Sequence, residues 1–180
     1  MKTLLLLLVA LSIVIGGCGG SSSEGKTVYL TATPGSDRLE ADVLTGNSCT
    51  DGGGTFTTQT VPITITSTPY SNSTVKSPVD INSVMISYAK YDLKSLAPEL
   101  PAQYDTGMII NAGESKTFNV KVATDKLNYD LVQNYGFNLC SADYWEYYAT
   151  ITFSGKETFT DKPVSFTTVV KVAFADRNNI

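Results

Sequence analysis

A chain of 180 residues, 42% of them hydrophobic, is long enough to bury one ordinary core. Its 13 Lys and Arg residues stand against 17 Asp and Glu residues and form no basic cluster, so the charge gives no electrostatic reason to bind nucleic acid. Histidine is absent, which excludes Ser-His and Cys-His nucleophile pairs and every His-ligated zinc or haem site.

Residues 1–17 have the pattern of a secretory signal peptide. Met1–Thr3 carries one positive side chain, and residues 4–15 form an apolar run broken only by Ser12. A membrane-spanning helix needs about 20 apolar residues, so this run is too short to span, and it lacks the polar face of a core helix. We therefore expect residues 1–17 to be removed and to take no part in the fold.

Residues 15–18 read Ile-Gly-Gly-Cys. An aliphatic residue, two small residues and a cysteine resemble the lipobox of bacterial lipoproteins. That resemblance implies cleavage before Cys18, a diacylglycerol on its thiol, and an exported protein held on an envelope membrane. By the same resemblance, Gly19 implies the outer membrane of a double-membraned cell. The alternative is an ordinary secreted protein in which Cys18 stands by chance.

Residues 18–25 connect this cysteine to the rest of the chain. Their Gly- and Ser-rich composition predicts a flexible tether with a reach of roughly 15 Å. Residues 26–180 are then the folded domain, with no internal repeat and no second domain. Without residues 1–17, 163 residues remain, with 12 basic and 17 acidic side chains because Lys2 leaves with the signal segment.

From residue 26 onward, apolar and polar residues alternate, and Val, Ile, Thr, Tyr and Phe are frequent, as half-buried strands require. The clearest case is residues 38–43, in which charged and apolar residues alternate strictly. Pro62 would remove a ladder donor, which predicts that its strand begins at a sheet edge. The alternation predicts seven strands with the following inward residues: Val28, Leu30 and Ala32; Leu39, Ala41 and Val43; Val61, Ile63 and Ile65; Val84, Ile86 and Tyr88; Phe118, Val120 and Val122; Ala149, Ile151 and Phe153; Val170, Val172 and Phe174.

Two segments depart from this alternation. Residues 125–135 place Leu127 and Leu131 four positions apart and are followed by Gly136, which predicts a short helix. The Pro-rich stretch Leu93–Tyr104 predicts a loop or an edge crossing.

Seven short strands with long connections predict an all-β fold, a single immunoglobulin-like β-sandwich. The resemblance is architectural, because the Cys-Trp-Cys spacing of immunoglobulin domains is missing. Tyr147 and Tyr148 precede the predicted sixth strand, near the place of the corner tyrosine in such domains. A jelly roll or a partly closed barrel is the alternative.

Cys49 and Cys140 are the two cysteines left after Cys18, and an even pair in an exported protein predicts a disulfide. A redox-active pair usually has the much closer C-x-x-C spacing. If the first two strands are halves of one edge strand, alternating strand directions bring both cysteine-bearing connections to the same end. We therefore expect their Cα atoms to lie roughly 4.4–6.8 Å apart.

The segment Asp143–Tyr148 is the densest aromatic cluster and holds the only tryptophan. Tyr144, Trp145 and Tyr148, flanked by carboxylates, offer the flat faces that sugar stacking and protein hot spots both use. The alternative is that Trp145 and one or two of the tyrosines close the end of the core.

The sequence contains no catalytic, metal-binding or cofactor motif. The Gly-rich loop at residues 47–54 lacks the Lys of a phosphate loop, and Asp51 lacks the spaced carboxylates of a calcium loop. A carboxylate pair hydrolyses glycosides without histidine, yet nothing in the sequence pairs any two of the candidate residues. These candidates are Glu99, Asp105, Asp143 and Glu146.

We therefore expect a non-enzymatic lipoprotein, anchored to an envelope membrane through Cys18, whose domain binds an envelope protein or serves a surface assembly. The alternative is recognition of a surface glycan, with or without hydrolysis, through Tyr144, Trp145 and Tyr148. No cofactor is expected in either case.

Overall fold

The computed structural model describes residues 25–50, 52–92, 97–142 and 144–177. The predicted signal peptide, Cys18 and all of the tether except Gly25 lie outside these residues, as do Asp51 and Asp143. The nine residues of the helix α1 (Asp125–Gln133) are too few to span a bilayer, and the described chain holds no other helix that could.

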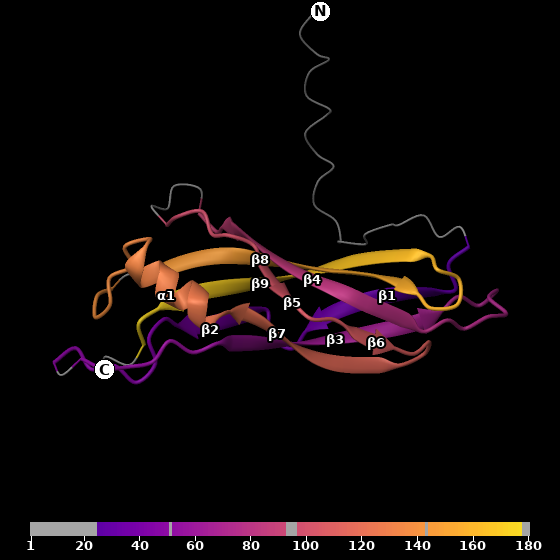
Figure 1. The fold of residues 1–180 in the computed structure, drawn as a ribbon, viewed down its shortest axis with the longest axis horizontal. Helices are drawn as coiled ribbons and strands as arrows, with labels where there is room; N and C mark the ends of the chain where they lie inside the picture. The colour runs from indigo at the N-terminus through magenta and orange to yellow at the C-terminus, as the bar shows by residue number, and fades with distance from the viewer. Residues whose placement is uncertain (1–24, 51, 93–96, 143, 178–180) are drawn as a thin grey trace, which may run out of the picture.

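The described residues fold into two facing β-sheets, with the core between them (Figure 1). One sheet has three strands in the order β1-β3-β7. The other has six, in the order β2-β9-β8-β4-β5, with β6 also paired to β4. The strands are β1 (Val28–Pro34), β2 (Arg38–Asp42), β3 (Gln59–Pro69), β4 (Val79–Lys90), β5 (Gln103–Asp105), β6 (Met108–Ile110), β7 (Ser115–Ala123), β8 (Tyr144–Glu157) and β9 (Pro163–Ala175).

This arrangement confirms the predicted immunoglobulin-like sandwich. The strands β1 and β2 follow one another closely in sequence but join different sheets: β1 pairs antiparallel with β3, and β2 pairs parallel with β9. They are the predicted halves of one split edge strand. Every other strand pair in the described chain is antiparallel.

The predicted alternation holds in the core. In β2 and just after it, Ala41 and Val43 are fully buried, Leu39 is partly buried against the core, and Glu40 is exposed. The same period of two runs through the long strands, because their inner faces supply the apolar surface that both sheets bury. The largest fully buried apolar side chains are Ile63, Ile65, Ile81, Ile86, Ile110, Leu127, Leu131, Tyr147, Ile151, Phe153 and Phe174.

The predicted helix near residues 125–135 is α1, which ends two residues earlier, at Gln133. Thr124 caps its start, since its side chain accepts a hydrogen bond from the Leu127 N–H at 3.1 Å. Gly136 follows with a φ of 76°, a left-handed conformation that glycine adopts without a steric penalty.

One prediction about a strand limit is wrong. β8 begins at Tyr144, so Tyr147 and Tyr148 lie inside this strand and not before it. The Tyr147 hydroxyl donates to the Pro98 carbonyl at 2.9 Å, so it ties β8 to a distant segment and does not act as a corner tyrosine. The prediction of a loop or an edge crossing over the stretch 93–104 fits its described part: residues 97–102 are irregular, and Gln103 begins the short strand β5 at the edge of the six-stranded sheet.

The prediction that the strand of Pro62 starts at a sheet edge is confirmed for its first residues, because β1 pairs with it only from Ile63 onward and Gln59–Pro62 pair with β7 alone. This strand, β3, is the central strand of the three-stranded sheet. Pro62 is tolerated because its neighbour β1 ends at Pro34, opposite Ile63, and the Gly35 N–H then donates to the Pro62 carbonyl at 2.7 Å. The missing N–H of Pro62 thus costs no regular ladder bond between β1 and β3.

The predicted disulfide is confirmed, with 5.6 Å between the Cα atoms of Cys49 and Cys140. Asp176, just beyond β9, accepts hydrogen bonds from the Cys140 N–H at 2.6 Å and from the Asn47 side chain at 3.0 Å. The bridge, α1 and the end of β9 therefore share one end of the sandwich, which we call the disulfide end (left in Figure 1).

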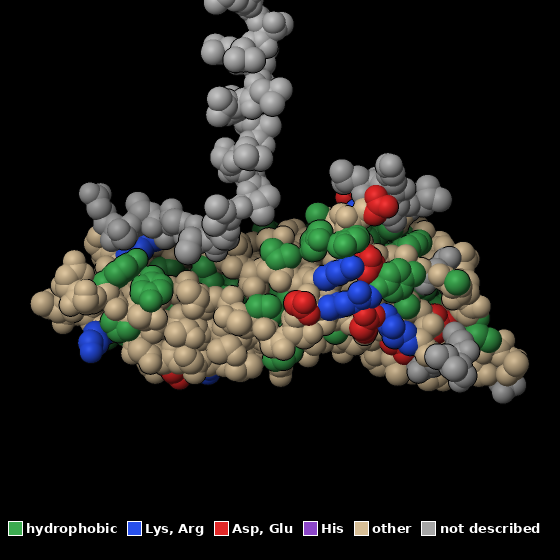
Figure 2. Space-filling view, turned by 180° about the vertical axis from the view of Figure 1, so that it is seen from behind, with side chains coloured by type: hydrophobic (Ala, Val, Ile, Leu, Met, Phe, Trp, Pro, Cys, Tyr) green, Lys and Arg blue, Asp and Glu red, His purple; other side chains and the backbone are tan. Residues whose placement is uncertain are grey.

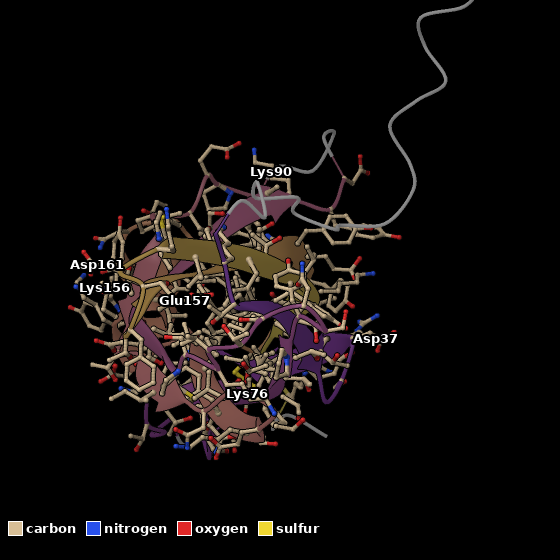
Figure 3. All side chains as sticks on the ribbon, turned by 90° about the vertical axis from the view of Figure 1, so that its right-hand side faces the viewer. Asp37, Lys76, Lys90, Lys156, Glu157 and Asp161 are labelled. Carbon is tan, nitrogen blue, oxygen red and sulfur yellow. A yellow bond between two sulfur atoms is a disulfide. The ribbon has the colours of Figure 1, made fainter. Side chains whose placement is uncertain are left out.

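The opposite end begins with Gly25, the first described residue, and we call it the tether end. Here Glu157, at the end of β8, accepts hydrogen bonds from the N–H groups of Thr27 at 2.7 Å and Val28 at 3.1 Å. Ser77 joins the connection between β3 and β4 to the same place, because its N–H donates to the Thr27 hydroxyl at 3.2 Å. Figure 3 looks onto this end, with Glu157 labelled within it.

Candidate functional site

The outer faces of the two sheets differ sharply in chemistry. On the three-stranded sheet, the outward residues of β3 and β7 are mostly Thr and Ser, and they bond to one another across the strands. The hydroxyl oxygens of Thr64 and Thr117 lie 3.0 Å apart, and those of Thr66 and Ser115 lie 2.9 Å apart. Paired small hydroxyls leave little for a partner to recognise.

On the six-stranded sheet, aromatic and charged side chains gather on the half of the outer face toward the disulfide end. In β8, Tyr144, Glu146 and Tyr148 point outward, while Trp145 and Tyr147 point inward. The strand register places Lys171 of β9 beside Tyr148, and Arg38 of β2 beside Lys171. We call the resulting set the tyrosine–ion patch: Arg38, Glu40, Tyr91, Tyr144, Glu146, Tyr148, Lys171 and Arg177 (Figure 2).

Glu146 is the centre of this patch. Its carboxylate lies 2.7 Å from the Lys171 ammonium and 3.4 Å from the Arg38 guanidinium, and it accepts a hydrogen bond from the Tyr144 hydroxyl at 2.7 Å. Glu146 and Lys171 are half-buried by their neighbours. Three partners on three strands fix this carboxylate, and partial burial makes their attraction stronger than that of an exposed ion pair.

Lys171 also holds the aromatic side of the patch. Its ammonium lies 3.7 Å from the centre of the Tyr91 ring, a cation–π contact. The Tyr91 ring in turn packs on Tyr148, with 5.2 Å between the ring centres. The two tyrosines are therefore held in place by a charge network rather than by the core.

A second ion pair closes the patch near the sheet edge. Glu40 of β2 forms ion pairs with both Arg38 and Arg177. The backbone N–H of Arg177 also donates a hydrogen bond to the Asp42 carboxylate at 3.0 Å. Partial burial, and then the nearby charge of Arg38, lower the pKa of Arg177. The three cations Arg38, Lys171 and Arg177 therefore lie among three carboxylates, those of Glu40, Glu146 and Asp42, so the charges of this region balance.

The predicted aromatic cluster is divided between the two faces of the sheet. Tyr144 and Tyr148 share the outer face and are 43% and 42% exposed. Trp145 is partly buried against the core, with its ring edge-on to Phe137 and 5.0 Å between ring centres. Tyr147 is fully buried, and this burial raises its pKa.

Three of the four carboxylates that the sequence offers for hydrolysis form an ion pair with a lysine. Glu99 lies 3.3 Å from Lys90, Asp105 lies 3.5 Å from Lys121, and Glu146 is held by Lys171. Asp143 lies outside the described residues. The described part of the chain offers one cluster of three residues of metal-binding types, namely Asp176 with Cys49 and Cys140. Because those two sulfurs are joined in the disulfide, they are not thiolate ligands.

A second surface feature lies at the disulfide end, where an open hollow separates the start of α1 from the loop before β3. The ring of Tyr129 meets Phe56 edge-on, with 5.5 Å between ring centres, and both line this hollow. Asp125 and Lys126 line it as well, but no described side chain converges on it in the way that a built ligand site requires.

Comparison of the chain with protein-family models, with curated proteins and with solved structures finds no match. The function of the domain must therefore be inferred from its own residues.

Proposed function

We propose that this chain is a non-enzymatic, lipid-anchored protein of a bacterial envelope, whose β-sandwich binds a protein partner through the tyrosine–ion patch. The observation that carries the proposal is the exposure of three tyrosines around a fixed charge network. Tyr91, Tyr144 and Tyr148 are 46%, 43% and 42% exposed on one face. Tyrosine and arginine are the residue types enriched at the energetic centres of protein interfaces.

Two properties of these side chains favour a binding role. The hydroxyls of Tyr91 and Tyr148 make no hydrogen bond within the described chain, so each offers a donor and an acceptor to a partner. Their rings are already held by Lys171 and by each other, so binding loses little side-chain entropy. A rigid sheet that carries such rings is suited to recognition.

The anchored part of the proposal is supported by the sequence of residues 15–18. A diacylglycerol on Cys18 holds a protein on a membrane stably, because each buried methylene contributes about 0.8 kcal/mol and two chains are present. Gly19 favours the outer membrane. Mass spectrometry of the mature N-terminus tests this part directly: an acylated Cys18 is expected, and a mature form that starts elsewhere without lipid contradicts it.

Site-specific photo-cross-linking in cells tests the binding face. A photoreactive residue at Tyr148 should give a discrete adduct with one protein, whereas the same residue at Thr64, on the outer face of the three-stranded sheet, should not. Lys171→Glu should abolish the adduct, because it removes the cation under Tyr91 and places two carboxylates together. Equal adducts from positions 148 and 64, or adducts insensitive to Lys171→Glu, would refute the assignment of this face.

A surface glycan is the second candidate partner, because exposed rings beside a carboxylate also suit sugar recognition. On the outer face this role falls to Tyr144, Tyr148 and Glu146, and Trp145 takes no direct part. A glycan panel distinguishes the two candidates: Tyr148→Ala should abolish glycan binding, and Trp145→Phe should leave it intact. A protein that binds no glycan on the panel leaves the protein partner as the proposal.

A further inference from the structure

Three lysines at the tether end make no ion pair within the described chain, and they lie beside exposed apolar side chains. The lysines are Lys26, Lys76 and Lys162. Phe159, in the turn between β8 and β9, is 66% exposed, and Val75 is 45% exposed. We infer that this end is a membrane-contact surface that docks on anionic phospholipid headgroups of the bilayer that holds the anchor.

Hydrogen bonds between three segments hold these side chains together. The Phe159 N–H donates to the Ser77 hydroxyl at 2.9 Å, and the Ser77 N–H donates to the Thr27 hydroxyl at 3.2 Å. Lys26 and Val75 line one hollow at this end. The lysines and Phe159 are therefore presented on one surface by a fixed backbone, with Lys76 labelled on it in Figure 3.

The charge at this end differs from that of the whole chain. Lys156 is neutralised by Asp161 at 2.6 Å, and the pair lies at the rim in Figure 3. The Glu157 carboxylate is fully buried and occupied by backbone N–H groups, and Asp80 is half-buried. Three lysines without an ion pair in the described chain therefore remain at this end, Lys76 and Lys162 exposed and Lys26 half-buried, on a protein whose net charge is −4. Anionic headgroups complement this surface.

The position of the anchor selects a lipid surface as the occupant. This inference rests on the proposed lipidation of Cys18. Seven Cα-to-Cα steps lead from Cys18 to Gly25 and span at most about 25 Å when fully extended. β8 begins at the disulfide end, and its 14 residues extend roughly 46 Å to Glu157 at the tether end. The tether end is therefore the end held at the bilayer, and an exposed Phe beside lysines is the side-chain pattern of a membrane interface.

A basic surface close to a lipid anchor can fix the orientation of the domain on the membrane. The acyl chains fix the protein to the membrane but leave the orientation of the domain free. Electrostatic contact at the tether end would hold the sandwich upright, since one acyl signal and one basic surface act together. The disulfide end and the tyrosine–ion patch would then face away from the lipid.

The test uses the mature, acylated chain with Phe159→Trp, in vesicles of phosphatidylcholine with or without about one-third phosphatidylglycerol. The contribution of the new indole at position 159 is obtained by subtracting the spectrum of the wild-type chain, in which Trp145 is the only tryptophan. We expect a blue shift and quenching by brominated lipid in the anionic vesicles. Tyr129→Trp, on α1 at the disulfide end, is the matched control and should show neither effect.

Replacing the three lysines with Gln in this background should lower the docked-to-undocked ratio by about a hundredfold, since each lysine near an anionic surface contributes about a factor of five. Lys126→Gln, on α1, should leave the ratio unchanged. Hydrogen exchange in the wild-type chain gives a second readout, because the amides of residues 158–162 should slow in anionic vesicles. Equal fluorescence quenching at positions 159 and 129 would overturn the docking surface. So would amide hydrogen exchange at residues 158–162 that is no slower in anionic vesicles.

Failure of the anchor is distinguished from failure of the docking surface by mass spectrometry and flotation. An acylated chain that floats with neutral vesicles but shows no quenching at position 159 retains the anchor and overturns the docking. If the chain is not acylated, co-sedimentation of the same chain with anionic vesicles at low salt supports the docking surface alone. Absence of both acylation and co-sedimentation overturns both inferences.

Discussion

Replacing Glu157 with Ala should release the start of β1 from the rest of the sandwich. This side chain is fully buried at the tether end. One of its oxygens accepts hydrogen bonds from the N–H groups of Thr27 and Val28, at 2.7 and 3.1 Å, and the other accepts one from the Thr160 hydroxyl at 2.5 Å. A single carboxylate thus joins the first strand to the hairpin of β8 and β9.

The magnitude follows from what the truncation leaves behind. Two buried N–H groups lose their acceptor, and each such group costs about 1–3 kcal/mol, so we expect a loss of about 4 kcal/mol. A domain of this size is stable by only about 5–15 kcal/mol in total, so the loss is a large fraction of its stability. Glu157→Gln keeps one oxygen for the N–H groups and should lose about half as much.

Denaturant titration measures the free energy of unfolding, and hydrogen exchange shows where the loss is local. The Thr27 and Val28 amides should exchange much faster in Glu157→Ala, while amides in the middle of β8 change less. Glu114→Ala is the matched control, because its carboxylate accepts one N–H, from Asn111 at 2.8 Å, in an exposed turn. If Glu157→Ala costs no more than this control, the carboxylate does not hold β1.

Three further predictions concern the core and the disulfide. Replacing Cys49 and Cys140 with Ser should lower the free energy of unfolding by up to about 4 kcal/mol in denaturant titration, because the bridge closes a long loop; no change would mean that the bond is absent from the mature protein. Burial raises the pKa of Tyr88 and Tyr147 above the ordinary value of 10.0, so their contribution to stability is complete below pH 10 and falls as the pH rises above it. With Phe at both positions, the alkaline loss of stability should be shallower, and an unchanged pH profile would contradict this origin. Gly155→Ala places a Cβ against the Asp80 carbonyl oxygen of β4, well inside van der Waals distance, and should cost about 2–3 kcal/mol in thermal or chemical unfolding; a neutral effect would mean that β8 and β4 are not so close.

The seven long strands could be predicted from the sequence because their signal is local. In residues 38–43 every second side chain meets the core, and the alternation records this directly. The short strands β5 and β6 could not be predicted in this way. Each has three residues, too few to show a period, and they are strands only because the edge of β4 offers them hydrogen-bonding partners.

Pro62 is a partial exception, because the predicted sheet edge at the start of its strand is present. The sequence correctly marks a missing donor, but whether that donor is needed depends on where the neighbouring strand β1 ends, which is a property of the whole sheet.

The candidate site was only half visible in the sequence. Tyr144 and Tyr148 stand out through aromatic density, but their grouping with Trp145 was misleading. The signal that separates them was present: Trp145 falls on the same parity as the inward residues Ala149 and Ile151, so extending the strand back to residue 144 would have placed Trp145 inside.

The charged residues of the patch could not be grouped from the sequence, because they become neighbours only in the folded sheet. Arg38 and Lys171 are 133 positions apart in the chain and become neighbours only through the parallel pairing of β2 with β9. No local pattern encodes that register, because it is set by which strands meet across the sheet. Tyr91 joins them for a similar reason, since it continues β4 beside Glu146 and its N–H donates to the Glu146 carbonyl at 2.9 Å.

One strand carries both proposed surfaces, and its length keeps them independent. Tyr148 and Glu157 lie nine positions apart on β8, a distance of roughly 30 Å along the strand. Charges this far apart are screened at physiological ionic strength, where the Debye length is about 8 Å. The two functions should therefore be separable by substitution: Gln at Lys26, Lys76 and Lys162 should weaken membrane contact without changing the adduct at position 148, and Lys171→Glu should do the reverse. Because distant sites add in free energy unless a shared element couples them, a combined variant should show the two losses side by side. A patch variant that altered the fluorescence quenching at position 159 in the Phe159→Trp background would instead mean that β8 transmits a change between the bilayer and the partner.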